Sequence, residues 1–404
     1  MSQDQKLQRK LSLPLITFYG LGTILGAGVY VLIGKVAGVA GVYSPLSFLV
    51  AATIAGFSAY TYSHLSRRYP KSAGEVVYVQ HGLKSHHLAS LVGFLVLATG
   101  SISAAAISRG FVGYLQIFWQ VDSSIAITLL LVSLGGLAIL GIAQSVGVAA
   151  LVTLLEIGGL MIILFVCRED LGQGLSSGTL LQLPTNSAAF AGVTAGAFLA
   201  FYSYIGFEDM VNVAEEVIHV ERNLPIAIFI ALTVSTLLYF LMAIAATSAL
   251  PLEQLSASDA PLAEIFVAKT GYSPEVISLI SMLAVVNGAL VQIIMASRVI
   301  YGMAKDSKLP PWLSKVNSHT GTPVRATLLV TAAVLVMALF LKMEALAKLT
   351  SGITLTIFGL VNLALVAIEW RTRSGKQRFS KIIVLPAIGA CLCLWMLLSS
   401  VLKF

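Results

Sequence analysis

The sequence predicts an all-α integral membrane protein with about eleven transmembrane helices. We expect two inverted five-helix repeats with broken helices 1 and 6, plus one extra helix. Of the 404 residues, 57% are hydrophobic and only 11% are charged, whereas about a quarter of an average soluble protein is charged. The apolar residues gather in long segments, and two of these segments, far apart in the chain, are interrupted near their middle.

A helix needs about 20 apolar residues to cross the hydrocarbon core of a bilayer. The segments that meet this length lie at 13–39, 43–66, 87–117, 122–141, 145–167, 190–217, 224–249, 276–302, 325–342, 345–369 and 381–402. We treat 1–404 as one domain, with repeat one at about 13–167, repeat two at about 190–369 and a peripheral helix at about 381–402. Two connecting stretches, 72–82 and 260–270, are predicted to be short surface helices or ordered loops.

The basic residues indicate the orientation of the chain in the membrane. The net charge is +7, but most Lys and Arg residues lie in short loops, such as Arg67 and Arg68 after the second segment and Arg371 and Arg373 after the tenth. These loops share one side of the membrane if the N-terminus is cytoplasmic, as the positive-inside rule requires. We therefore expect a multi-pass protein of the cell membrane and no nucleic acid partner. The three cysteines form no spacing typical of disulfides or metal ligands.

The two interrupted segments are the main functional signal in the chain. Segment 13–39 contains four closely spaced glycines (Gly20, Gly22, Gly26 and Gly28), and segment 190–217 contains the run SYIGFED at 203–209. Glycines and carboxylates in mid-membrane are costly unless the freed backbone lines an enclosed cavity. A matched pair of broken spans predicts a binding site near the bilayer midplane. The alternative is that the glycines only allow tight packing between helices.

Backbone groups freed at a break suit a zwitterion. The start of the second half-helix would offer amide N–H groups of Gly26, Ala27 and Gly28 to a carboxylate. Carbonyl oxygens near Thr23 and Ile24 would accept from an ammonium group. At the second break, we expect the binding residues to be Phe201, Tyr202, Ser203, Tyr204 and Ile205. Their aromatic rings would cap the substrate, although such rings are by default packing residues.

Carboxylates inside a span are functional hypotheses in themselves. Glu156 lies in the middle of segment 145–167, and we expect it to act as a protonation switch or to pair with a group on the first or eighth span. The alternative is a static glutamate that only fastens helices together. Glu208 directly follows the second break, and we expect it to act in gating or proton coupling.

GTILGAGVYVL at 22–32 and FYSYIGFEDMVNVAEEV at 201–217 contain the two interruptions. They are similar to the first-span glycine motif and the sixth-span motif of the amino acid–polyamine–organocation superfamily of permeases, which the sequence resembles. YPKSAGEVVYV at 69–79, RNLPIAI at 222–228 and TPVRATLL at 322–329 agree as well. The resemblance implies a leucine-transporter-like fold. It also implies a gating role for Glu208, whereas the place of Glu156 often holds a lysine in that superfamily.

These observations predict a secondary active transporter that moves amino acids by alternating access, through proton symport or exchange. The alternatives are a transporter of polyamines or organic cations and a transporter-like amino acid sensor. An enzyme is not expected, because the chain has no nucleophile motif and no phosphate-binding GxxxxGK[ST] loop. We expect no cofactor and no metal site, with H+ as the coupling ion and Na+ left open. The expected partners are an amino acid and the lipid bilayer, and the oligomeric state is open.

Overall fold

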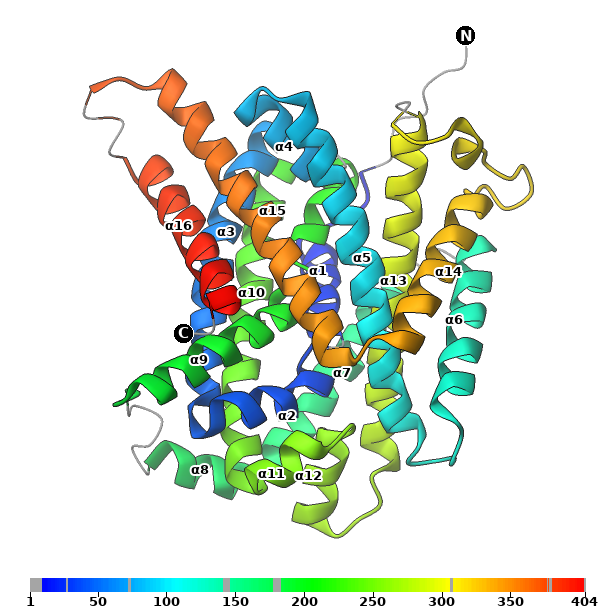
Figure 1. Ribbon diagram of the computed structural model, residues 1–404, viewed down its shortest axis with the longest axis vertical. Helices are drawn as coiled ribbons and strands as arrows, with labels where there is room; N and C mark the ends of the chain where they lie inside the picture. Colours follow the sequence, from blue (N-terminus) through cyan, green and yellow to red (C-terminus); the bar gives the residue numbers. More distant parts are fainter. Residues whose placement is uncertain are drawn as a thin grey trace.

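The computed structural model describes residues 9–26, 28–71, 74–140, 146–176, 183–305, 308–375, 377 and 380–402 (Figure 1). Helices are the only regular elements in these ranges, apart from one isolated bridge between Leu11 and Val217. The α-helices are α1 (Leu13–Leu25), α2 (Gly28–Ala40), α3 (Ser44–Arg68), α4 (Gly74–Leu83), α5 (His86–Leu115), α6 (Ser123–Ile139), α7 (Val146–Val166), α8 (Arg168–Ser176), α9 (Ser187–Ala200), α10 (Val220–Ala249), α11 (Leu252–Ala257), α12 (Pro261–Thr270), α13 (Glu275–Lys305), α14 (Val324–Phe340), α15 (Met343–Thr372) and α16 (Lys381–Leu402). Short 3₁₀ helices are η1 (Gly41–Tyr43), η3 (Phe201–Tyr204), η4 (Glu208–Glu216) and η5 (Pro311–Ser314).

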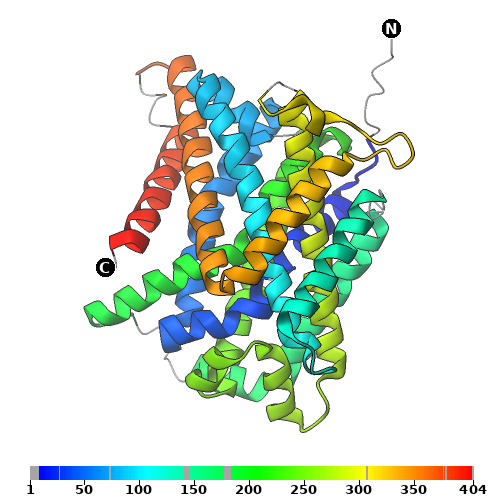
Figure 2. The same ribbon diagram turned by 45° about the vertical axis from the view of Figure 1, so that its right-hand side comes forward.

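The predicted membrane class is confirmed by the lengths of these helices. Within the described ranges, seven helical segments are long and apolar enough to cross a membrane, or eight if the bent pair α7–α8 is one span. The two shorter apolar helices α6 and α14 also lie where spans were expected. The long helices α5, α13 and α15 run upright through the molecule (Figure 2). The predicted count of eleven spans stays a prediction, because it depends on how broken and short helices are counted.

Local sequence signals explain where several helices begin and end. The Asp122 side chain accepts hydrogen bonds from the amides of Ser124 and Ile125 (2.9 and 3.2 Å) at the start of α6. Asn186 caps α9 in the same way by accepting from the Ala189 amide (2.8 Å). Such caps satisfy amides that have no partner within the helix. At the other end of a helix, Gly271 takes a left-handed conformation (φ +68°) and terminates α12.

Both predicted helix breaks are present. The first span divides into α1 and α2 at Gly26, whose backbone leaves the helical region with φ −19° and ψ −96°. In Figure 1, α1 stands upright in the centre of the molecule, whereas α2 lies crosswise beside α9. The second break is longer than the first. After α9 the chain tightens into η3, becomes extended at Ile205, turns at Gly206 with φ +132° and resumes as η4.

The short helix α4 corrects one expectation from the sequence. The stretch 72–82 was predicted to be a surface element, and its described part is helical as expected. However, α4 packs against α5 and α15, and one face of it is buried: Gly74, Glu75, Tyr78, Val79 and Gly82. A Cβ atom on Gly82 would lie 2.4 Å from Cβ of Ala364 on α15, so glycine allows this close contact. A carboxylate, Glu75, therefore becomes part of the interior.

Candidate substrate site at the two helix breaks

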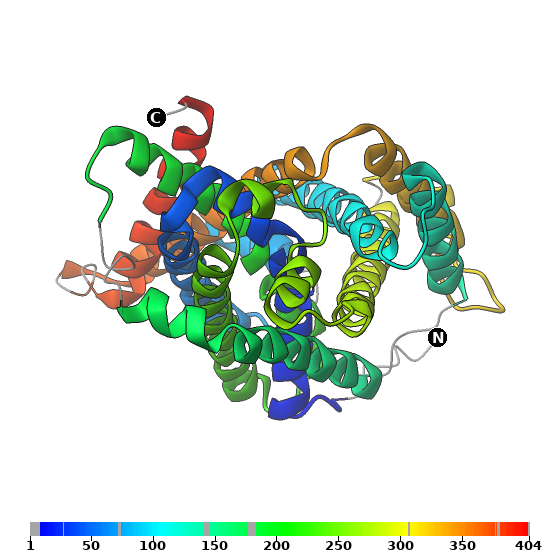
Figure 3. The ribbon, with the colours of Figure 1, turned by 90° about the horizontal axis from the view of Figure 1, so that it is seen from below.

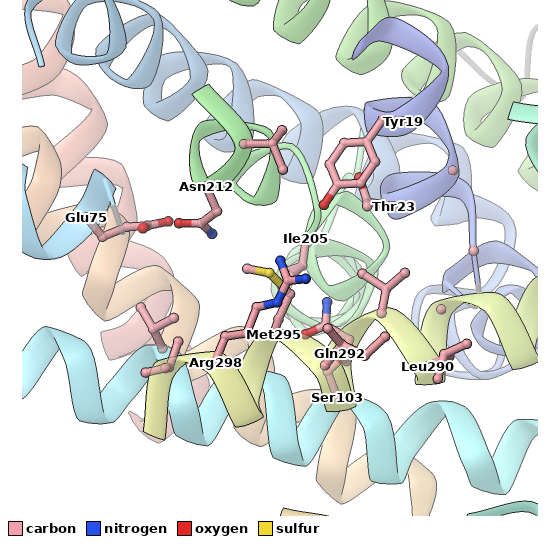
Figure 4. A pocket seen from close by; sticks show the side chains of 18 of the residues that line it. Tyr19, Thr23, Glu75, Ser103, Ile205, Asn212, Leu290, Gln292, Met295 and Arg298 are labelled. Atoms are coloured by element: carbon pink, nitrogen blue, oxygen red, sulfur yellow. The ribbon is translucent and has the colours of Figure 1, made fainter. Parts of the chain in front are cut away.

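A cavity of about 660 Å³ begins at the two breaks and extends between α1, α5, η4 and α13. Its lining continues to Leu11, just before α1, and to Lys308, just after α13. Figure 4 shows side chains from α1, α5 and α13 pointing into it. Its volume is within the range of roughly 300–1,000 Å³ that is typical of small-molecule sites.

The two breaks contact each other directly, which fixes their relative position. The hydroxyl group of Thr23 donates to the carbonyl oxygen of Gly206 (2.9 Å), and Gly28 packs against Ser203. A Cβ atom on Gly28 would lie 2.6 Å from Cα of Ser203. Glycine at position 28 therefore permits the close approach of the two backbones. Position 206 also favours glycine, because its φ of +132° is rarely adopted by other residues.

Freed backbone groups lie where the sequence predicts them. Gly28 lines the cavity and is the first residue of α2, so its amide has no partner within its own helix. The carbonyl oxygen of Ile24 accepts a hydrogen bond from the hydroxyl group of Tyr239 on α10 (2.7 Å), which leaves one lone pair for another donor. Gly26 also lines the cavity, next to Cα of Gly288 on α13.

The predicted binding residues divide into two groups. Those that line the cavity are Thr23, Ile24, Gly26, Gly28, Tyr202 and Ile205. Phe201, Ser203 and Tyr204 do not line it: Phe201 packs against Phe358 (ring centroids 5.8 Å apart) and Tyr204 against Tyr239 (5.3 Å). Ala27 lies outside the described residues. The role of each of these residues in binding stays a prediction.

Tyr202 is held in place by α5. Its hydroxyl group lies 3.0 Å from the hydroxyl group of Ser103, and both residues line the cavity. The η3 helix turns this ring towards the cavity while its neighbours Phe201 and Tyr204 pack behind it. The tyrosine therefore presents a fixed aromatic wall to any molecule bound at the breaks.

Glu156 lies behind the first break rather than in the cavity wall. It is fully buried on α7, and its backbone carbonyl oxygen accepts a hydrogen bond from the hydroxyl group of Tyr30 on α2 (2.5 Å). Neither carboxyl oxygen has a hydrogen-bond partner among the described residues. The side chain of Asn287, which does line the cavity, is close enough to act on this carboxyl group. Glu156 is therefore linked to the cavity through a single residue, Asn287.

Glu208 and Asp209 lie beside a second, smaller cavity that adjoins the first. Glu208 accepts a hydrogen bond from the Gly206 amide (2.8 Å), so its carboxyl group is tied to the break itself. Asp209 accepts one from the side-chain amide of Gln292 on α13 (3.2 Å). Both acidic side chains are only 8% exposed. They connect the second break to α13 through polar contacts.

Several lining residues were not anticipated from the sequence: Tyr19, Glu75, Ser103, Thr153, Asn287, Gln292 and Arg298. A signal existed for Asn287 and Gln292, because polar amides are uncommon in the middle of an apolar span. Thr153 lies three residues before Glu156 on α7, and its hydroxyl group donates to the carbonyl oxygen of Phe18 on α1 (3.2 Å). Arg298 extends its side chain into the cavity (Figure 4).

The comparisons with known proteins agree with this architecture. The chain is 28% identical over 394 residues to "Cationic amino acid transporter 2, vacuolar" of Arabidopsis thaliana, covering 91% of this chain and 61% of that protein. It is 26% identical over 422 residues to the "Branched-chain amino acid permease BcaP" of Bacillus subtilis (strain 168), covering 98% of this chain and 89% of that protein. The chain spans 61%, 63% and 64% of the lengths of three Arabidopsis relatives.

The fold is shared with a solved structure. The crystal structure of MhsT in complex with L-phenylalanine matches with a TM-score of 0.62 and 12% identity, covering 98% of this chain and 100% of that one. This likeness confirms the leucine-transporter-like fold. A family model described as amino acid permease matches residues 11–403. The chain is therefore a multi-pass membrane protein that belongs to the amino acid permease family.

Proposed function

We propose that this protein is a secondary active transporter that moves amino acids across the membrane by alternating access. The observation that best supports this function is a cavity that ends at two apposed helix breaks. There, Gly28 at the N-terminus of α2 and Ile24, whose carbonyl oxygen keeps one lone pair, line the same cavity. An amino acid places a carboxylate and an ammonium group on one carbon atom, and these two poles match those two backbone groups.

The cavity wall favours a substrate with an apolar side chain. Ile24, Ile107 and Ile205 line the cavity from α1, α5 and the second break. The aromatic ring of Tyr202 closes the same region. An apolar side chain would displace water from these walls and gain about 25 cal/mol for each Å² buried. Polyamines and other organic cations are the runner-up, because they lack the carboxylate that the α2 amides would receive.

Proton coupling is the second part of the proposal, with exchange as the alternative mode. Glu156 and Glu208 are both buried. Glu156 lies beside the side chain of Asn287 on α13, and Glu208 accepts a hydrogen bond from the Gly206 amide at the second break. Loading and releasing a proton at either group would change the charge next to the breaks, and thereby bias the opening of the cavity.

Counterflow in proteoliposomes tests this function. Purified protein is reconstituted with unlabelled L-leucine inside the vesicles, and entry of labelled L-leucine is measured, with L-arginine and putrescine as competitors. We expect transient accumulation of label, which an excess of unlabelled L-leucine outside the vesicles prevents and putrescine does not. A matched control is protein-free vesicles. Binding of leucine without counterflow would favour the sensor alternative, and block by putrescine alone would favour an organic cation transporter.

A further inference from the structure

We propose that Glu75, Glu208 and Asp209 form one proton-binding site, in which a shared proton connects the buried helix α4 to the second break. The three carboxylates come from two elements, α4 and η4, and all three line the same small cavity of about 30 Å³. Glu75 also lines the large cavity, so the site has direct access to it. This inference extends the proposed transport function, but the site can be tested without it.

The charge balance of the cluster requires protons. Glu75 is 2% exposed, and Glu208 and Asp209 are 8% exposed. Among the described residues, none of the three forms an ion pair with Lys or Arg. The charge of Asp209 acts on both glutamates, and that of Glu75 acts on Glu208. Carboxylates that share a buried site cannot all be ionised without a strong mutual repulsion.

Two orphaned hydroxyl groups point to a ligand in the same space. Thr99 on α5 and Thr354 on α15 line the small cavity and are 8% and 1% exposed. Neither Oγ1 atom has a hydrogen-bond partner in the part of the chain that the structure describes. A space of about 30 Å³ accommodates one water molecule, which would need two to four polar partners. The two hydroxyl groups and the carboxyl groups that line this cavity would supply these partners. Such a water molecule would carry a proton between Glu75 and η4.

The groups around the cluster favour a proton, rather than a metal ion, as the ligand of this site. The elements around the cluster contribute the phenols of Tyr62 on α3, Tyr78 on α4 and Tyr19 on α1, and the guanidinium of Arg298 on α13. The large cavity also includes Glu216 and Lys308. Within the described ranges, no three acidic, His or Cys side chains are arranged to hold a metal ion. A proton fits such a dispersed set of oxygen atoms.

The titration of Glu75 supports the same conclusion. Burial raises the pKa of this carboxyl group to about 8, and the negative charge of Asp209 adds to the rise. Glu75 therefore exchanges its proton close to physiological pH. Because α4 is anchored to α15 at Gly82 whereas Glu208 is bonded to the break at Gly206, the proton would link a fixed part of the molecule to the broken span.

Infrared titration of purified protein tests the site directly. The carbonyl stretch of protonated carboxyl groups is followed from pH 5 to pH 10 in wild-type protein, in Glu75→Gln and in Asp209→Asn. We expect a band in the wild type that is lost with a midpoint near 8 and is missing in Glu75→Gln. We expect Asp209→Asn to shift this midpoint towards lower pH. The matched control is Glu221→Gln, an exposed acidic residue of α10, which should leave the band unchanged.

Three outcomes would overturn the proposal. The first is that the wild type shows no carboxyl band that titrates between pH 6 and pH 10 (about two pH units either side of the Glu75 midpoint). This measurement does not depend on the folding of any variant. Asp209→Asn would leave the midpoint unmoved, which would mean that the groups titrate independently. Addition of NaCl at constant ionic strength would shift the midpoint, which would assign the site to an alkali cation.

Transport measurements separate this site from the proposed function. Proton entry during labelled L-leucine uptake is followed with a pH-sensitive dye inside the vesicles. We expect Glu75→Gln to lower the number of protons that enter for each leucine taken up. If wild-type protein moves no leucine but shows the coupled titration, the proton site stands and the transport function fails. If leucine moves and the titration is absent, the reverse holds.

Discussion

The hydroxyl group of Thr23 donates a 2.9 Å hydrogen bond to the carbonyl oxygen of Gly206, 183 residues further along the chain. This bond joins the two broken spans at the point where each leaves its helix. Gly206 also lies so close to α1 that a Cβ atom on it would be 2.5 Å from the Thr23 carbonyl oxygen. The floor of the cavity is therefore made of two backbones in contact.

We predict that Gly206→Ala lowers transport by about tenfold or more, because alanine at φ +132° is strained and its methyl group would push the breaks apart. Gly136→Ala is the matched control, since a Cβ atom there meets nothing within 4 Å. Initial rates of labelled L-leucine counterflow, normalised to reconstituted protein, give the comparison. Equal rates for the two variants would contradict the importance of this contact.

Tyr202→Phe keeps the aromatic wall but removes the hydroxyl group that lies 3.0 Å from that of Ser103. We expect a modest loss of apparent affinity for leucine, roughly fivefold, which corresponds to one hydrogen bond worth about 1 kcal/mol. Tyr202→Ala should cost considerably more, because it also removes the wall. Concentration-dependent counterflow measures both, and indistinguishable values for the two variants would show that the ring does not contact the substrate.

A lysine on α2 links this helix to the segment around α11. Lys35 donates to the carbonyl oxygens of Ser256 and Ser258 (2.9 and 3.1 Å), next to α11. Seen from below in Figure 3, α11 and α12 (yellow-green) cover the region beside α2 (dark blue). These contacts link α2 to α11 and to the residue that follows it.

We expect Lys35→Met to favour opening of the α11–α12 face. The readout is labelling of a cysteine introduced at Ile107, which lines the cavity, in protein whose three native cysteines are replaced. A membrane-impermeant thiol reagent applied to the α11–α12 face should label the Lys35→Met variant several times faster. Lys348→Met, which breaks only an exposed ion pair with Glu344, is the control. Unchanged labelling would mean that Lys35 does not restrain this face.

Glu369 joins two helices at the end where α3 and α15 meet. It is 6% exposed and pairs with Arg68 on α3 (3.1 Å) and with Arg373 (2.7 Å). We predict that Glu369→Gln lowers the free energy of unfolding by about 1–2 kcal/mol. The loss stays this small because both arginines are partly exposed and remain hydrated when the carboxylate is removed. Thermal unfolding should shift by a few degrees while leucine counterflow persists. Loss of counterflow in folded protein would assign this pair a functional role.

The pKa of Glu75 also predicts how stability depends on pH. The pKa is about 8 in the folded protein against an ordinary value of 4.5, so the folded state holds a proton that the unfolded state releases. The stability that this proton provides is complete below pH 4.5 and is lost as pH rises through 8. Apparent melting temperature should therefore fall across this window in the wild type. The fall should be smaller in Glu75→Gln, and an equal fall would contradict the assignment.

The sequence was sufficient to locate both breaks, because a glycine or a carboxylate inside an apolar segment is visible without any tertiary information. It also placed Tyr202 and Ile205 near the site. It did not distinguish them from Phe201 and Tyr204, which pack against Phe358 and Tyr239 instead. Which of these adjacent side chains faces the cavity depends on the tight turn of η3 and on the neighbours that receive each ring.

The sequence by itself determined the membrane class, the long helices and their interruptions, since lipid forces each span to satisfy its own backbone hydrogen bonds within local sequence. Only the tertiary structure decided that Glu75 joins Glu208 and Asp209, and that Gln292 bonds to Asp209. These residues are distant in the chain and are brought together by the packing of α4 and α13 around the second break. Such contacts depend on helix placement, which no local pattern of residues encodes.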